Sequence, residues 1–146
     1  LINVNNEPKV IEYNVRMGDP ETEAVFPRIQ NDFVEIFQSF KNKTLDEINI
    51  KIDERASATV VLVSGGYPNK YKKGLKITGI DEVINSTVYH AGSIQKGNDI
   101  YTNGGRVLAI TSFGKNFKDA LNNSYQSASK INFEGMYYRK DLGFDL

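Results

Sequence analysis

The sequence contains no cysteine, which excludes disulfide bonds and zinc–thiolate sites and fits a reducing compartment. It also has no excess of either charge, because 18 lysine and arginine residues balance 18 acidic residues. Without a basic surface, we expect neither nucleic acid nor an anionic membrane as a partner. No apolar run approaches the roughly 20 residues that cross a bilayer, and no signal peptide is visible. We therefore expect a cytoplasmic protein.

The remaining composition is that of an ordinary globular protein, with 40% hydrophobic and 25% charged residues. Its 146 residues suffice for one domain with a sizeable core, or for one domain and a piece of another. The chain starts at Leu1 without a methionine, and residues 1–4 already have a strand pattern. We therefore expect the C-terminal part of a longer protein.

The first third of the chain predicts a β-hairpin and a helix. Residues 1–4 and 9–15 have strand patterns, and the polar residues 5–8 between them form the expected turn. From Pro27 the apolar residues follow helical spacing, which predicts an amphipathic helix that ends near residues 42–43. We expect the apolar face of this helix to be core: Ile29, Phe33, Ile36, Phe37 and Phe40.

The polar residues 44–54 indicate a boundary, so we expect two parts, 1–53 and 54–146. In the second part, the β-branched run 58–64 predicts a strand that is buried on both faces. Asn116 is a suitable N-cap for a following helix. Further strands are expected at 76–77, 87–91, 106–112 and 131–139. The fold class is therefore α+β, with a mixed and mostly antiparallel sheet and flanking helices.

Residues 11–16 alternate three polar with three apolar side chains. In a strand, Glu12, Asn14 and Arg16 would share one face, while the apolar Ile11, Tyr13 and Val15 would pack inward. Carboxylate and carbonyl oxygens bind Mg²⁺ together with substrate phosphates, and arginine binds phosphate in a bidentate manner. The row has the groups that a metal–nucleotide site needs. A solvated strand face with a cross-strand ion pair is the alternative, and periodicity alone does not decide against it.

Several stretches together resemble one enzyme family. They are "VIEYNVRMGDPETE", "FPRIQNDFVEIF", "DERASATVVLVSGGYP", "HAGS", "TNGGRVLAITSFG" and "FEGMYYRKDLG". In their order and spacing, they closely resemble the end of the ATP-grasp domain and the whole C-terminal domain of the phosphoribosylamine–glycine ligases. The resemblance implies that 1–53 is the end of an ATP-grasp domain (hairpin, helix and linker). It implies that 54–146 is the C-terminal domain of the family.

The resemblance also implies a reaction in de novo purine biosynthesis. Glycine is joined to 5-phosphoribosylamine, ATP is cleaved to ADP and phosphate, and a glycyl phosphate is the intermediate. Glu12 and Asn14 correspond to the ligands of Mg²⁺ or Mn²⁺, and Arg16 corresponds to the catalytic residue that steadies the transferred phosphoryl group. Asp19 and Arg106 are candidates for substrate binding, although Asp19 could equally stabilise its turn and Arg106 could be a surface residue.

Other polar residues receive structural assignments. We expect Glu21 to support a turn, His90 to be a packed or hydrogen-bonded residue without a catalytic role, and Arg139 to pair with Asp141. The amino-terminal domain, lid and nucleotide-binding lysines of the family are absent from this chain, so we expect it to be inactive alone. The alternatives are a non-catalytic α+β packing module of a multidomain protein, or another ATP-grasp carboxylate–amine ligase.

Overall fold

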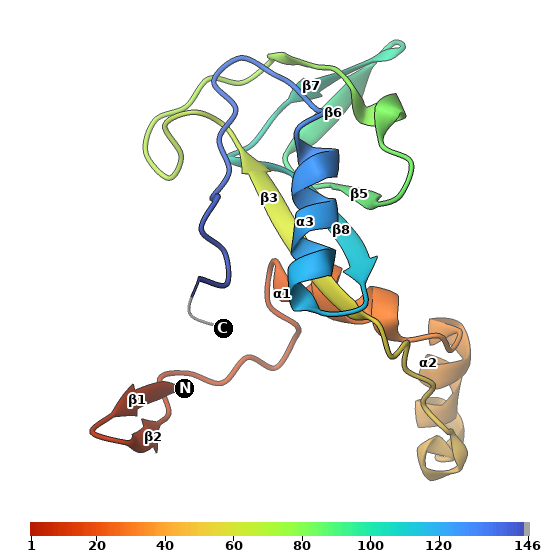
Figure 1. Cartoon of the computed structure of the whole chain (residues 1–146). Helices are drawn as coiled ribbons and strands as arrows, with labels where there is room; N and C mark the ends of the chain where they lie inside the picture. The colour runs from red at the N-terminus through yellow and green to blue at the C-terminus, as the bar shows by residue number, and fades with distance from the viewer. Residues whose placement is uncertain (145–146) are drawn as a thin grey trace.

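The computed structural model describes residues 1–144, and its centre is a three-stranded antiparallel sheet (Figure 1). Strand β3 (Ala56–Val63) pairs with β8 (Arg106–Gly114), and β5 (Thr87–His90) pairs with the other edge of β8. Burial along β3 alternates, with Val60 and Leu62 fully buried and the residues between them partly exposed. The two faces of this sheet therefore have different environments.

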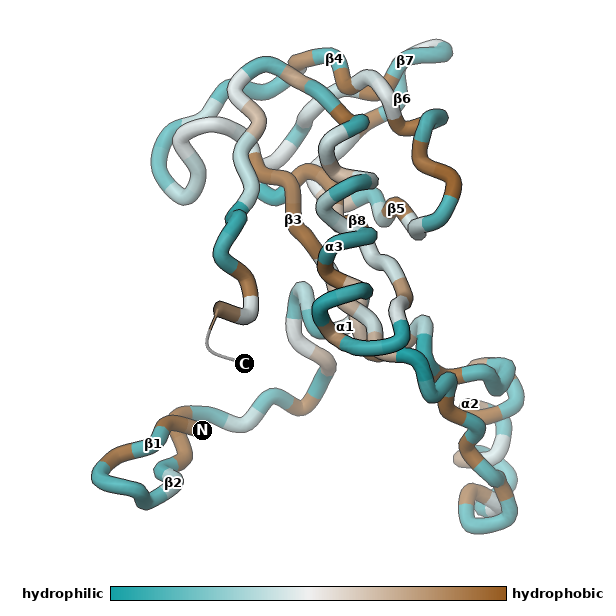
Figure 2. Tube along the Cα trace, in the orientation of Figure 1, coloured by the Kyte–Doolittle hydropathy of each residue, from teal (hydrophilic) through white to brown (hydrophobic). Residues whose placement is uncertain are grey.

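Helix α3 (Phe117–Ala128) covers one face of this sheet. Asn116 caps the helix, because its Oδ1 accepts a hydrogen bond of 2.9 Å from the Asp119 amide. The core between helix and sheet is aliphatic, which Figure 2 shows as brown along β3 beside the mostly teal outer side of α3. Ser124 is a fully buried polar residue of α3, and its hydroxyl donates to the Ala58 carbonyl at 2.8 Å. This core, in which the buried Ser124 hydroxyl has a hydrogen-bond partner, holds α3 against the central sheet.

A second antiparallel sheet lies beyond the first, with strand order β4–β7–β6. Its strands are β4 (Lys76–Ile77), β6 (Ser93–Lys96) and β7 (Asp99–Thr102), and a short 3₁₀ helix, η3 (Ile80–Glu82), follows β4. None of the helices within residues 1–144 is long and apolar enough to span a membrane.

The residues before β3 form short helices. Helix α1 (Glu21–Val25) and the 3₁₀ helix η1 (Phe26–Arg28) precede α2 (Phe33–Asn42) and η2 (Leu45–Glu47). Only α1 lies on the central sheet, where the Thr111 hydroxyl donates to the Glu23 carbonyl at 2.9 Å. Figure 1 shows α2 extending away from the sheet.

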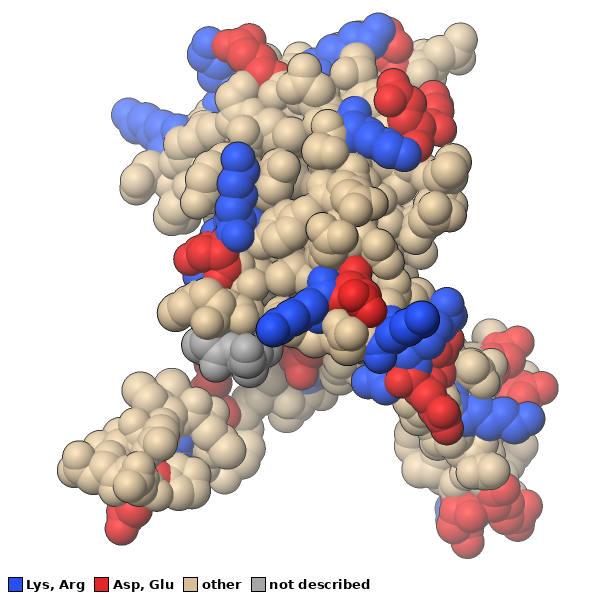
Figure 3. Space-filling view, viewed as in Figure 1, with Lys and Arg blue, Asp and Glu red and all other residues tan. Residues whose placement is uncertain are grey.

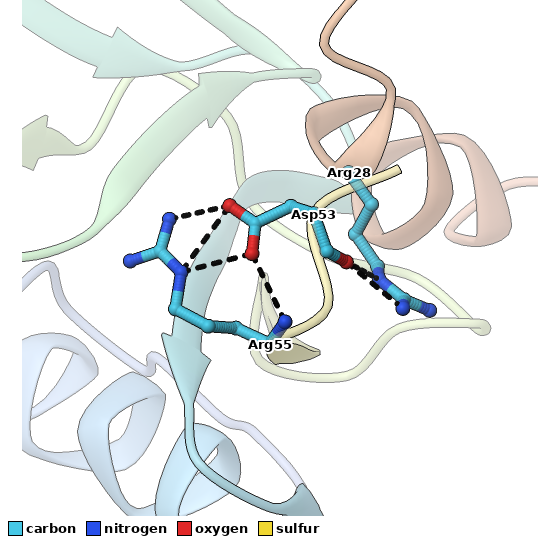
Figure 4. Close-up of polar contacts among 3 residues, drawn as sticks. All are labelled: Arg28, Asp53 and Arg55. Atoms are coloured by element: carbon cyan, nitrogen blue, oxygen red, sulfur yellow. Dashed lines mark hydrogen bonds and ion pairs between the residues drawn. The ribbon is translucent and has the colours of Figure 1, made fainter. Parts of the chain in front are cut away.

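A bidentate contact anchors the base of the α2 segment. The guanidinium of Arg28 donates to the Asp53 carbonyl at 3.0 and 3.2 Å, and the Asp53 carboxylate accepts from Arg55 at 2.6 and 3.0 Å (Figure 4). The hydrogen bonds from Arg55 lower the pKa of Asp53 to about 2. Asp53 thus connects the segment before α2 to the start of β3.

The predicted α+β class and the antiparallel sheets are confirmed, as are the strands at 58–64, 76–77, 87–91 and 106–112 within one or two residues. The helix capped by Asn116 and the end of α2 near Lys43 are confirmed as well. Lys43 ends α2 in the left-handed conformation, with φ of 60°.

The predicted strand at 9–15 is wrong. The N-terminal hairpin consists of β1 (Ile2–Val4) and β2 (Glu7–Lys9), with a tight turn at Asn5 and Asn6, which have φ of 54° and 64°. Residues 10–17 form no strand, and three side chains expected to be buried are 66%, 86% and 101% exposed: Ile11, Tyr13 and Val15. A two-stranded hairpin is marginal alone, because it has no layer on which to bury an apolar face.

The helix expected from Pro27 starts later than predicted. Pro27 lies in η1, and α2 begins after Asp32, whose carboxylate caps the helix by accepting from the Val34 amide at 2.7 Å. Within α2, Ile36 is buried, but Phe37 and Phe40 are 61% and 56% exposed, so their expected place in a core is wrong. Within residues 1–144, no element covers that side of the helix.

The strand expected at 131–139 is also wrong. Only two isolated antiparallel bridges form there, Asn132 with Thr78 and Tyr137 with Val63. Between them Gly135 adopts φ of 71°, a left-handed conformation that interrupts an extended strand.

Candidate functional site

The predicted metal row lies in the irregular segment 10–17, on the exposed side of the molecule near the hairpin. Asn14 Nδ2 donates to Glu12 Oε1 at 3.2 Å, so these two side chains do share one side. Arg16 instead donates from Nη1 to the Met17 carbonyl at 3.0 Å. The expected proximity therefore holds for Glu12 and Asn14, but the rigid strand expected beneath them is absent.

The donor chemistry of this pair suits a hard divalent cation. Glu12 offers a carboxylate and Asn14 a carboxamide oxygen, and Mg²⁺ is commonly held by one or two such groups with water and phosphate completing the shell. Asn14 presents its nitrogen to Glu12 here, so ligation by its oxygen requires rotation of the amide. Within residues 1–144, no three His, Cys, Asp or Glu side chains gather in a metal-binding cluster. The pair supplies part of a coordination shell.

The other two predicted site residues contact each other. Arg106 Nη2 lies 3.2 Å from Asp19 Oδ2, across 87 positions of sequence. Asp19 precedes α1, whereas Arg106 begins β8, so the ion pair joins the turn after the metal row to the central sheet. Both side chains remain about half exposed, which leaves them accessible to a ligand. The structure does not bring this pair into contact with Glu12, Asn14 or Arg16.

Arg106 also borders a cleft of about 280 Å³ on the face of the sheet opposite α3. The outward-facing residues of β3 form its floor, because Thr59, Val61 and Val63 alternate with the core residues. Arg139 is the second cation of the cleft. The remaining wall residues are mostly aromatic: Tyr67, Tyr137, Tyr138, Pro20 and Leu142. The cleft combines an apolar floor with guanidinium groups, a composition typical of ligand sites.

Tyr67 reaches this cleft because of a glycine in the neighbouring turn. A Cβ atom at Gly105 would overlap the Tyr67 ring, so the ring lies directly against the backbone there. Ser64 fixes the same turn, with its hydroxyl donating to the Gly104 carbonyl at 2.8 Å. Sequence reasoning missed Tyr67, although the paired glycines of "SGGYP" signal a loop that approaches other backbone closely.

Three structural expectations agree with the observed contacts. Glu21 accepts a hydrogen bond of 2.7 Å from the Gly18 amide, which stabilises the turn before α1. His90 Nδ1 lies 2.8 Å from the Ser93 hydroxyl. Arg139 pairs with Asp141 at 2.9 Å, and these hydrogen bonds lower the pKa of the Asp141 carboxyl. None of these residues needs a catalytic role to explain its position.

A carboxylate that sequence reasoning missed belongs to α1, the helix that packs on the central sheet. Glu23 Oε2 is buried and has no hydrogen-bond partner among the described residues. Burial raises the pKa of the nearby Tyr89, and the charge of Glu23 acts in the same direction. The sequence gave no signal of this environment, because the burial of Glu23 depends on the packing of α1 against the distant strands β3 and β8.

Comparison with known proteins decides the family. A family model described as phosphoribosylglycinamide synthetase, C domain, matches residues 57–145. The chain belongs to this family. A phosphoribosylamine–glycine ligase of Vibrio vulnificus is 44% identical over 99% of this chain and 34% of its own length. The crystal structure of phosphoribosylamine–glycine ligase from Thermotoga maritima has a TM-score of 0.77 and 32% identity, covering 96% of this chain and 34% of that one.

A bifunctional purine biosynthetic protein of Dictyostelium discoideum is 46% identical over 92% of this chain and 17% of its own length. The resemblance to the phosphoribosylamine–glycine ligases, predicted from the sequence motifs, is thus confirmed. The chain spans about a third of the length of the phosphoribosylamine–glycine ligases that it matches.

Proposed function

We propose that this chain is part of an ATP-dependent phosphoribosylamine–glycine ligase of purine biosynthesis. The reaction would join glycine to 5-phosphoribosylamine through a glycyl phosphate, giving glycinamide ribonucleotide, ADP and phosphate. The observation that carries the proposal is the 44% identity over 99% of this chain to a relative of that name. The aligned region includes 99% of this chain, so it covers the segments that carry the metal row, the cleft and the core.

In this proposal, residues 1–53 are the end of an ATP-grasp domain with its linker, and 54–146 are the C-terminal domain. The missing partner is the amino-terminal and ATP-grasp remainder of the same protein. Exposed apolar side chains before residue 53 support this partner, since Tyr13, Val15 and Phe37 are 86%, 101% and 61% exposed. Apolar surface of this extent is typical of an interaction face.

Glu12 and Asn14 would hold Mg²⁺ or Mn²⁺, and Arg16 would contact the phosphoryl group in transfer. A bound divalent ion neutralises nucleotide phosphates and so lowers the barrier to phosphoryl transfer. Glu12 contributes a full negative charge toward the ion, whereas Asn14 contributes a neutral oxygen. Arg16 has no carboxylate partner within residues 1–144, so its guanidinium is available for a phosphate.

Asp19 and Arg106 would bind substrate at the mouth of the cleft. An anionic group of the substrate can replace Asp19 on Arg106, because the pair is half exposed and its atoms are 3.2 Å apart. The displaced Asp19 carboxylate would then be free for an amine. The ion pair thus keeps both residues in position before substrate arrives.

The isolated chain is expected to fold without binding ATP or making product, because the resemblance assigns the nucleotide-binding lysines and the lid to the remainder of the protein. Calorimetric titration with Mg²⁺–ATP and a phosphate-release assay with glycine and phosphoribosylamine test this expectation. Micromolar ATP binding by the 146 residues would place the nucleotide site within this chain and contradict our assignment.

The activity itself is tested by Glu12→Gln in the full-length protein. Loss of residues that only support a metal's ligands lowers metal affinity or activity by about 10–100-fold. Loss of a charged ligand itself should therefore reduce the rate at limiting Mg²⁺ by at least about 100-fold. Glu7→Gln is the matched control, because Glu7 lies on β2, in the hairpin that precedes the segment 10–17, and pairs with Lys9 at the surface. An unchanged Mg²⁺ dependence in Glu12→Gln would exclude Glu12 as a ligand.

A non-catalytic packing module is the second candidate, and the exposed apolar residues of the first 53 positions favour it. The two proposals differ in one measurement. In the full-length protein, a packing module predicts that Glu12→Gln and Glu7→Gln have equal activity.

A further inference from the structure

A polar depression of about 390 Å³ lies on the α3 side of the central sheet, away from the Arg106 cleft. It is enclosed by α3, the C-terminal end of β8 and the segment before β5. Its polar lining consists of two cations, three carboxamides and a hydroxyl: Arg55, Lys130, Asn85, Asn123, Gln126 and Ser127. No acidic side chain of the described residues lines it. The depression therefore favours a small anionic molecule.

Arg55 is held rigidly at one end of this depression. Its Nε and Nη2 donate to Asp53, and its guanidinium lies over the Phe113 ring at 4.4 Å from the centroid. No contact within residues 1–144 uses Nη1, and Figure 4 shows this nitrogen outside the contacts with Asp53. A fixed guanidinium with a free donor loses little conformational entropy when it binds an anion.

Lys130 is the second cation. Its Nζ donates to the Glu82 carbonyl at 2.9 Å, which positions the ammonium without neutralising it. No carboxylate among residues 1–144 lies within ion-pair distance of this ammonium. Figure 3 shows blue and red side chains next to one another near the top and the bottom of the face that α3 presents, with mostly tan residues between them.

The carboxamides supply hydrogen bonds between these charges. The side chains of Asn85 and Gln126 make no hydrogen bond within the described residues, whereas Asn123 donates to the Phe113 carbonyl at 2.9 Å and keeps its oxygen free. Ser127 is fixed by a 2.6 Å contact with Ser86. Amide groups both donate and accept, so they match hydroxyl groups, which do the same.

We propose that this depression is a binding site for a small phosphorylated sugar, separate from the site of the ligase reaction. The phosphate would bind the Lys130 ammonium, the sugar hydroxyls would contact Asn85, Asn123 and Gln126, and Arg55, whose charge Asp53 balances, would offer its free Nη1 donor. The volume lies within the range of small-molecule sites, about 300–1,000 Å³. The proposal rests on these side chains and does not depend on ligase activity.

The test titrates ¹⁵N-labelled chain of 146 residues with glucose 6-phosphate, and separately with glucose and inorganic phosphate. The expected result is a shift of the Asn85, Asn123 and Gln126 side-chain amide signals by the sugar phosphate, with much weaker binding of either half. Lys130→Gln should weaken binding at least about fivefold, because it removes one charge from the phosphate position. Lys118→Gln is the matched control, since Lys118 is an exposed lysine of α3 that lines neither this depression nor the Arg106 cleft.

Three results would overturn the proposal. The first is the absence of any amide shift at about 10 mM ligand, a concentration that still detects millimolar affinity. The others are shifts confined to other parts of the chain, or equal affinities of Lys130→Gln and Lys118→Gln for the sugar phosphate. Equal affinities for inorganic phosphate and the sugar phosphate would remove the role of the carboxamides. The same titration of full-length protein, with ligase activity measured in parallel, separates this site from the proposed reaction.

Discussion

The two parts of this chain handle apolar residues in opposite ways. Among residues 1–144, thirteen of the fourteen buried hydrophobic residues lie after residue 54, and Ile36 alone lies before it. Of the twenty exposed large hydrophobic residues in the same range, fifteen lie before residue 54. Composition does not explain the difference, because both parts contain amphipathic patterns. The second part carries its own core, whereas the first part has apolar faces without a covering layer.

The largest expected effect is in the core of the second part. Leu108→Ala should lower the free energy of unfolding of the chain by about 2–5 kcal/mol, because Leu108 is fully buried in β8 and its loss leaves a cavity. Urea unfolding followed by circular dichroism measures this change. A loss below 1 kcal/mol, roughly that of a conservative core change such as Ile→Val, would show that β8 is not the centre of the core.

A matched pair of substitutions compares the two parts directly. Val60→Thr and Val15→Thr exchange a methyl for a hydroxyl at nearly constant shape, at positions that are 0% and 101% exposed. Val60→Thr should cost about 1–3 kcal/mol, since its hydroxyl is buried away from water. Val15→Thr should change the free energy of unfolding by no more than about 0.5 kcal/mol. Equal losses of unfolding free energy in the two variants would contradict the distinction between the two parts of the chain.

The smallest effect is expected at Asp53, where the two parts join, and only in acid. The folded pKa of about 2 lies below the ordinary value of 3.8, so this carboxylate stabilises the fold above pH 4 and loses that contribution as the pH falls toward 2. In Asp53→Asn, the urea midpoint of unfolding should therefore fall less steeply between pH 4 and pH 2 than in the wild type. Asp46→Asn, at an exposed position without an ion pair in residues 1–144, should keep the wild-type slope. An unchanged slope in Asp53→Asn would contradict the assignment.

The success of sequence reasoning follows the same division. The β-branched run of β3 and the Asn116 cap predicted their elements correctly, because the residues that bury them lie in the same chain. Residues 11–15 have an equally clear alternation, yet no strand forms where a covering layer is absent. At 131–139 the apolar residues suggested a strand, but one left-handed glycine limits pairing to single bridges.

The candidate site was predictable to a similar extent. The neighbouring positions of Glu12 and Asn14 followed from local spacing. The ion pair of Asp19 with Arg106 did not, because it depends on how α1 lies on the sheet 87 positions away. The positions of Tyr67 and Arg55 depend in the same way on contacts between distant segments.

The contact of Tyr67 with Gly105 also constrains how this protein can change over generations. Any residue with a Cβ at 105 would displace the tyrosine ring, so a substitution there requires the ring to move or position 67 to become smaller. The order of mutations then matters, since shrinking Tyr67 first opens the cleft and removes part of its wall. Two positions 38 residues apart in the sequence are thus coupled by one contact, and a library that varies both should recover viable pairs that single-site libraries miss.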